Sequence, residues 1–234
     1  MPSGRGRILG EVRSGAIAVS EIAYAGGSML GTHRHRRAYV SVLVEGAYTE
    51  LRDGMPRYCT TGTVIVHPPG EVHADYFVAP GRCINFDVHD DRADTHAALL
   101  RAARATHPGA EQAIRTALPG LVDKLPQSAA PEWLPIVLRD FRWVQAGPLQ
   151  GAADLAGTHP THFARTFRKY VGMTPGRYRR RERVRAASQL LLGSPVSLSD
   201  IAFACGFADQ SHLTNVFRET AGISPKRFRS AFAR

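Results

Sequence analysis

The feature that most limits the fold of this chain is a repeat near its C-terminal end. The segment FRKYVGMTPGRYRR starts at Phe167, and the segment FRETAGISPKRFRS starts at Phe217. The two segments align without gaps, and in both a glycine precedes a Thr-Pro or Ser-Pro pair by two residues. Self-similarity of this kind indicates one supersecondary unit that occurs twice. The C-terminal part should therefore fold as two similar units.

Each copy has the local chemistry of a helix-turn-helix. Small residues in the first helix of each unit let two helices cross closely. Gly157 or Gly206 then ends that helix, because glycine adopts the left-handed conformation at little cost. The next helix carries an apolar stripe at i, i+3 and i+4. The stripe residues are Phe163, Thr166 and Phe167 in the first copy, and Leu213, Val216 and Phe217 in the second. A plain duplicated helical hairpin is the alternative interpretation.

Helical patterns fill the chain after residue 131. Thr174-Pro175 and Ser224-Pro225 each supply an N-cap followed by proline at the first helical position. Apolar spacing predicts helices over 132–144, 149–156, 160–170, 174–192, 197–204, 209–219 and 224–232. The helix over 174–192 joins the two units, and its buried stripe is expected to be Tyr178, Val184, Ala187 and Leu191.

The positive charge is concentrated in the same part of the chain. Residues 132–234 contain 16 Lys/Arg and 7 Asp/Glu, whereas residues 1–131 contain 14 and 13. A neutral half joined to a basic half indicates that one part contacts a polyanion. The charge distribution thus favours DNA binding over the plain hairpin.

Residues 197–229, SLSDIAFACGFADQSHLTNVFRETAGISPKRFR, closely resemble the signature of the AraC/XylS family of transcription regulators. The match covers Ile201, Ala202, Gly206, Phe207, Asp209, Ser211, Phe217, Arg218, Gly222, Ser224, Pro225, Phe228 and Arg229. The first unit looks like the family's more divergent first helix-turn-helix. The resemblance implies a sequence-specific DNA-binding regulator rather than an enzyme. Double-stranded DNA, a second copy of the chain and RNA polymerase are its implied partners.

One face of the second helix in each unit lies opposite the apolar stripe, and this face should enter the major groove. Base contacts are expected from Thr161, His162 and Arg165 in the first unit, and from Gln210, Ser211 and Asn215 in the second. Arg168 and Arg218 lie a turn later and are expected at phosphates. If Arg183 on the joining helix meets DNA only at phosphate, its replacement by Ala should weaken binding evenly across sequences. For any one of these residues, a solvated surface side chain is the alternative.

Residues 8 to about 90 read as strands. Runs such as IAVSEIAYA, AYVSVLVEGAYTEL and TVIVH are rich in β-branched and aromatic residues, and Gly and Pro separate them. Many short strands with frequent turns predict a barrel or sandwich. From Asp94 on, two Ala- and Leu-rich stretches indicate helices, and KLPQSAAPEW marks a boundary near residue 130.

The predicted architecture is therefore α+β with two domains. Residues 1–94 form a β-barrel, residues 95–131 form a helical connection and possible dimerisation region, and residues 132–234 form an all-α DNA-binding domain. The chain shows no apolar signal core at its N-terminus and no stretch that approaches a membrane span. We therefore expect a cytoplasmic protein without a membrane partner.

GTHRHRRAYVSVLVEG followed by GTVIVHPPGEVHADYF resembles the two halves of the cupin barrel motif. The resemblance implies a cupin-like sensor domain that binds a small-molecule effector. The expected lining of its pocket is His33, His35, Tyr39 and His73. Ordinary polar loop positions are the alternative for His33 and His35.

A metal ion at His33, His35 and His73 is a less favoured possibility. In metal cupins a Glu stands at the place of Tyr39 and an Asn at the place of Phe77, so one usual ligand is missing here. We therefore expect no metal cofactor.

Three other functions compete with the effector-responsive regulator. The first alternative is a metal-dependent cupin enzyme that carries a DNA-binding domain. The second is a DNA-bending protein without a ligand, and the third is a DNA-repair methyl acceptor, which needs a multi-cysteine zinc site. The chain has only three scattered cysteines, Cys59, Cys83 and Cys205, which do not supply such a site.

Overall fold

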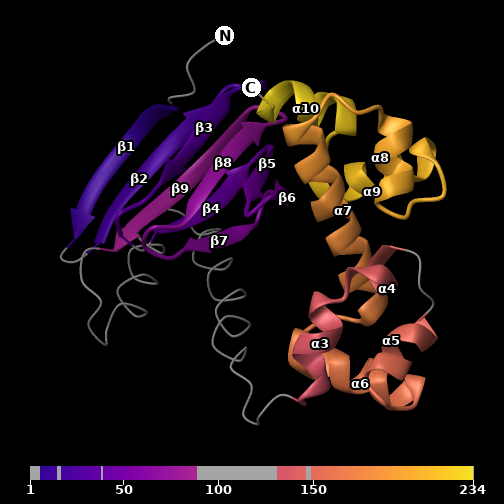
Figure 1. Cartoon of the computed structure of the whole chain (residues 1–234). Coiled ribbons are helices and arrows are strands. Elements are labelled where there is room, and N and C mark those ends of the chain that lie inside the picture. Colours follow the sequence, from indigo (N-terminus) through magenta and orange to yellow (C-terminus); the bar gives the residue numbers. More distant parts are fainter. Residues whose placement is uncertain (1–5, 15–16, 38, 89–130, 146–148, 234) are drawn as a thin grey trace. The chain divides into compact units, whose positions relative to one another are not determined.

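The computed structural model describes residues 6–14, 17–37, 39–88, 131–145 and 149–233. It divides the chain into two compact units, one of strands and one of helices, and each is described by itself (Figure 1). The helices predicted between Asp94 and residue 124 lie outside the described residues. The domain boundaries 1–94, 95–131 and 132–234 therefore stay a prediction.

Antiparallel strands in two sheets form the N-terminal unit (Figure 1). One sheet has the order β1-β2-β9-β4-β7 and the other the order β3-β8-β5-β6. The strands are β1 (Arg7–Ser14), β2 (Ile17–Tyr24), β3 (Met29–Arg34), β4 (Tyr39–Glu45), β5 (Ala47–Arg52), β6 (Met55–Thr60), β7 (Val64–His67), β8 (Val72–Phe77) and β9 (Gly81–Val88). These two sheets form the predicted β-barrel.

The strand alternation separates a cavity-facing set of side chains from an apolar set. On β4, Tyr39 and Ser41 line an internal cavity, whereas Val40 and Val42 belong to a buried apolar cluster. On β9, Asn85 lines the cavity and Phe86 belongs to the cluster. Because successive side chains of a strand point to opposite faces, one strand serves both surfaces.

Helices α3 to α10 build the C-terminal unit (Figure 1). Their bounds are α3 (Trp133–Arg139), α4 (Phe141–Gln145), α5 (Leu149–Leu155), α6 (Pro160–Val171), α7 (Pro175–Gly193), α8 (Leu198–Ala204), α9 (Gln210–Ala221) and α10 (Pro225–Phe232). The first helix-turn-helix is α5–α6, the second is α8–α9, and α7 joins them. None of the described helices has both the length and the apolar character needed to span a bilayer.

The predicted caps of the helical unit are present. The Thr174 hydroxyl accepts from the Arg177 backbone N–H at 3.3 Å, and the Ser224 hydroxyl accepts in the same way from Arg227. Gly172 ends α6 in the left-handed region with φ 75°. Tyr178, Val184, Ala187 and Leu191 are buried along α7, as expected. Local cap chemistry therefore fixes where these helices begin and end.

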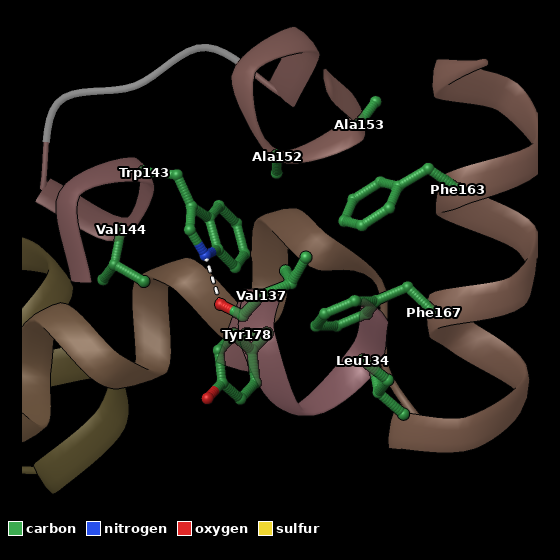
Figure 2. Packing of buried hydrophobic residues seen from close by; sticks show 9 residues of the cluster. All are labelled: Leu134, Val137, Trp143, Val144, Ala152, Ala153, Phe163, Phe167 and Tyr178. Carbon is green, nitrogen blue, oxygen red and sulfur yellow. Dashed lines mark hydrogen bonds between the residues drawn. The ribbon is translucent and has the colours of Figure 1, made fainter. Parts of the chain in front are cut away.

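The single helix predicted over residues 132–144 is wrong, because the chain breaks it into α3 and α4. Asp140 between them is extended, with φ −80° and ψ 97°. The break lets Trp143 enter the core, where its indole N–H donates to the Val137 carbonyl at 2.7 Å (Figure 2). The buried indole thus satisfies a carbonyl that a continuous helix would have bonded internally. Packing of Trp143 outweighs local helical preference here.

Candidate nucleic-acid interface and barrel cavity

Helices α6 and α9 each bury one face and expose the other. Phe163 and Phe167 of α6 are fully buried, as are Leu213 and Phe217 of α9. The eight residues expected to contact DNA on these helices are all exposed. They are Thr161, His162, Arg165, Arg168, Gln210, Ser211, Asn215 and Arg218. The structure therefore gathers them into two groups, one on each helix.

Short contacts order the exposed face of α6. The Nδ1 atom of His162 accepts from the Arg165 guanidinium at 3.4 Å, and its Nε2 atom lies 3.4 Å from the Thr166 hydroxyl. The His162 ring is thus held between two neighbours on its own helix. This arrangement limits the positions that the Arg165 side chain can take.

Helix α9 begins at a cap that sequence reasoning missed. Asp209, which we expected inside the helix, accepts from the His212 backbone N–H at 2.7 Å through Oδ1. An Asp at the start of an apolar helical pattern is the signal that could have identified this cap. The cap fixes the first turn of α9, where Gln210 and Ser211 lie.

Several arginines of α7 pair with acidic side chains. Arg180 pairs with Glu219 of α9, and Arg181 pairs with Glu182 at 2.9 Å. Arg183 instead contacts backbone carbonyls. Its Nε and Nη2 atoms donate to the carbonyls of Val144 and Gln145, both at 2.6 Å. The last carbonyls of a helix lack partners within it, and here the guanidinium supplies the missing donors at the end of α4.

Gln145 extends this contact to the second helix-turn-helix. Its Nε2 atom donates to the Ala204 carbonyl, at the end of α8, at 2.6 Å. Gly206 has φ +77°, and a Cβ at this position would collide with the Gln145 carbonyl. Gln145, Arg183, Ala204 and Gly206 form a junction of α4, α7 and the turn after α8. We refer to these four residues below as the junction.

In the barrel, a cavity of about 330 Å³ collects all four residues expected to bind a small molecule. His33 and His73 pair across β3 and β8, with ring centroids 4.2 Å apart. The His35 ring stacks on Tyr39 at 4.1 Å with 5° between the ring planes. The tyrosine that replaces the usual Glu therefore packs flat against an imidazole.

A fourth histidine of this cavity was missed from the sequence. His67 lies opposite Tyr39 in the pairing of β4 with β7, and its ring centroid is 4.0 Å from that of His73. His67 directly precedes Pro68 in the second half of the cupin-like motif, and this position was the available signal. Its imidazole completes a group of four on one side of the cavity.

Two glutamates near His67 were also missed. The Nδ1 atom of His67 donates to Glu71 Oε1 at 2.7 Å, and Arg52 donates to the other Glu71 oxygen at 3.0 Å. Glu50 is 1% exposed, and its Oε1 atom lies 3.8 Å from His67 Nδ1. Because Nδ1 of His67 carries the donated proton, its Nε2 atom is an acceptor when the ring is neutral.

Burial sets the charge states inside the cavity. It lowers the pKa of His35 to about 4 and that of His73 to about 3, and the neighbouring histidines add to both shifts. Both rings are therefore neutral at pH 7. Burial also raises the pKa of Asp75 well above its usual range and that of Glu50 above its ordinary value. Desolvation disfavours the charged form in each case.

Two groups of side chains in the cavity could hold a metal ion. His33, His35 and His73 form one group, and His67, Glu71 and His73 form the other. Within each group the ligand atoms lie within 4.8 Å of one another. The first group consists only of imidazoles, whereas in the second Glu71 already binds Arg52 and His67. Neither group has the separate free carboxylate that a three-His, one-Glu site would need.

Comparison with known proteins identifies the helical unit. Residues 152–231 match a family model described as a helix-turn-helix domain. The bifunctional transcriptional activator/DNA repair enzyme AdaA of Bacillus subtilis is 31% identical over 109 residues, which cover 46% of this chain and 50% of AdaA. The transcriptional activator RhaS of Escherichia fergusonii is 43% identical over 65 residues, which cover 28% of this chain and 23% of RhaS.

The barrel has its own likeness among solved structures. A cupin superfamily protein from Desulfitobacterium hafniense is similar to 38% of this chain, over 83% of its own length, with 12% identity and a TM-score of 0.35. Of the two relatives of the helical unit, AdaA and RhaS, this chain matches half or less of the full length.

Proposed function

We propose that this chain, whose residues 152–231 match a helix-turn-helix domain, is a sequence-specific transcription regulator of the AraC family controlled by a small molecule in its barrel. The observation that carries the proposal is the pair of exposed faces on α6 and α9. Each face presents polar and basic side chains opposite a fully buried apolar stripe. Such a face is what a helix needs to read base edges in a major groove.

The joining helix supports a reading of two grooves by one chain. Helix α7 has 19 residues, and its length is therefore about 28 Å at about 1.5 Å per residue. One turn of DNA is about 34 Å long. The two recognition helices would then lie in successive major grooves on one side of the duplex. The shortfall favours bending of the DNA toward the protein.

The barrel supplies the sensing half of the proposal. Its cavity of about 330 Å³ falls in the size range of sites for small molecules. The four residues His33, His35, Tyr39 and His73 would contact the effector there. We further propose that the protein contacts RNA polymerase, since the relatives AdaA and RhaS carry the name of transcriptional activators. A homodimer on DNA is a separate part of this proposal.

A repair activity, which the name of AdaA includes, does not suit the cysteines of this chain. Burial raises the pKa of Cys59 and Cys83 to about 12 and that of Cys205 to about 11. A thiol acts as a nucleophile through its thiolate, so these three stay unreactive at neutral pH. We therefore propose a regulator that is not an enzyme.

A metal-dependent cupin enzyme is the second candidate, and the four clustered imidazoles favour it. Metal analysis of the purified full-length protein separates the candidates. The regulator proposed here holds well below one transition metal ion per chain. A full equivalent that is lost on His73→Ala would instead support the enzyme.

DNA binding by fragments tests the proposal. Residues 132–234 should shift DNA in a gel, and residues 1–130 should not. Arg–phosphate contacts release counterions, so the affinity should fall about a thousandfold between roughly 50 and 200 mM salt. Affinity that resides in residues 1–130, or that does not respond to salt, would contradict the proposal.

A further inference from the structure

The lining of the barrel cavity has an uneven charge. Among the described residues that line it, two are aspartates, Asp75 and Asp87, and none is Lys or Arg. An anionic ligand would therefore meet two carboxyl groups and no basic Lys or Arg side chain among these lining residues. The lining suits a cation.

Asp75 of the cavity lining has a second carboxyl group beside it, that of Glu50. Glu50 and Asp75 are direct partners in the pairing of β5 with β8, so their side chains leave the sheet on the same face. Directly opposed like charges destabilise a sheet. Neither Glu50 oxygen has a hydrogen-bond partner among the described residues, although the side chain is buried. The nearest imidazole nitrogen of His73 lies 3.8 Å from Asp75 Oδ2, beyond hydrogen-bond distance.

Aromatic rings share the cavity lining with Asp75. Tyr24 stacks on Phe77 at 4.1 Å, and Tyr48 stacks on Phe77 at 5.1 Å. Burial and the charge of Asp75 both raise the pKa of Tyr24, Tyr39 and Tyr48, so this carboxylate lies close to three tyrosines. A carboxylate among aromatic rings provides an ion pair and cation–π attraction for the same positive group.

Buried ring nitrogens add polar atoms to which a ligand can form hydrogen bonds. His35 Nε2 and His73 Nδ1 are buried without a hydrogen-bond partner among the described residues, and both rings line the cavity. A primary ammonium carries three N–H donors, so it can bond to a carboxylate and to neutral imidazoles together. Buried polar atoms without partners are costly, and such a ligand would satisfy them.

The size and the apolar part of the cavity distinguish an organic cation from a bare ion. A volume of about 330 Å³ is far more than one metal ion fills, and Ile22 and Leu30 contribute an apolar wall. We propose that the barrel binds a small organic amine, with its ammonium group at Asp75 and its apolar body against the aromatic rings. That this amine is the effector rests on the proposed function; that it binds the barrel does not.

Calorimetry on the full-length protein without DNA tests the proposal. The probes are two sets of matched compounds: benzylamine, benzyl alcohol and benzoate, and hexylamine, hexanol and hexanoate. Each set keeps the apolar body and changes only the charge. We expect at least one amine to bind, and its alcohol and carboxylate to bind roughly tenfold more weakly or not at all.

Isosteric variants locate the site. Asp75→Asn removes the charge and keeps the shape, so it should weaken amine binding by roughly tenfold or more. Asp53→Asn is the matched control, because Asp53 is exposed at the β5–β6 turn with φ 51°, a conformation that Asn tolerates. This control should bind amines like the wild type. Thermal unfolding of both variants checks that the barrel is intact.

Three results would overturn the amine proposal. They are tighter binding of the carboxylates, amine binding that Asp75→Asn leaves unchanged, and no binding by either amine at millimolar concentration. A full equivalent of metal held in the cavity would also overturn it. A gel shift with the same preparation measures DNA binding separately, so failure of the amine proposal is distinguishable from failure of the regulator proposal.

Discussion

Asp75 is a buried carboxyl group whose charge should lower the stability of the fold and favour the binding of a cation. Its pKa is raised first by burial and then by Glu50, which faces it from β5. The tyrosines and His73 around Asp75 are neutral at pH 7, so they do not offset the repulsion between the two carboxyl groups. His67, Arg52 and Arg57 lower the pKa of Glu50, but burial outweighs them and its pKa stays above the ordinary value. The carboxylate should therefore cost folding stability unless a cation is bound.

The pH dependence of stability tests this cost. Below the unfolded pKa of Asp75, near 3.8, both states are protonated and the cost is absent. As pH rises through the raised folded pKa, folding must hold a buried charge, and stability is lost. The thermal unfolding temperature of Asp75→Asn should therefore be higher than that of the wild type at pH 8. The difference between the two temperatures should shrink as pH falls toward 4. A difference that is constant with pH, or a less stable variant at pH 8, would count against the account.

The exposure of single residues was predictable where they lie on a helix face opposite an apolar stripe. The faces with Arg165 and Asn215 follow from the position of the apolar stripe, and both residues are exposed. The cavity was only partly predictable. The motif identified His33, His35, Tyr39 and His73, but His67 and Glu50 join the site through strand pairing. A pairing register depends on distant segments, so residue spacing does not reveal it.

Among the elements, helix ends follow local chemistry and helix contacts do not. Thr174 and Ser224 mark starts that the sequence predicts, since cap and proline are adjacent in the chain. The break at Asp140 and the junction depend on tertiary contacts. Arg183 looked like one more basic residue of α7, yet its guanidinium closes the end of α4. We therefore expect the junction to set how the two helix-turn-helix units are oriented.

Replacement of Arg183 tests that role. Arg183→Ala removes two charge-assisted hydrogen bonds and should lower the free energy of unfolding by about 1.5–3 kcal/mol. It should also weaken discrimination between DNA sites whose half-sites differ in spacing, while binding to an isolated half-site changes little. Denaturant unfolding and gel shifts on a spacing series measure the two effects.

Arg177→Ala is the matched control, because Arg177 is exposed on the same helix. It should leave both stability and spacing preference near the wild-type values. If Arg183→Ala behaved like this control and weakened all sites equally, Arg183 would be a phosphate contact after all.

At the scale of the whole molecule, the repeat, the charge distribution and the strand pattern predicted the α+β architecture. The order of strands in the two sheets was beyond sequence reasoning, because β9 pairs with both β2 and β4, from which it is distant in the chain. The central claim concerns the helical unit: one chain reads two successive grooves with α6 and α9. Arg suits guanine and Asn suits adenine at base edges, with each such contact worth roughly 1–3 kcal/mol against a wrong base.

Selection of binding sites from randomised DNA by the full-length protein and two variants tests this claim most directly. The wild type should select two blocks of preferred bases about one helical turn apart. Arg165→Ala should relax preference in one block only, and Asn215→Ala should relax it in the other. If both variants altered the same base pairs, or if neither altered any preference, the two-groove account would be contradicted, and one of the two units would be structural.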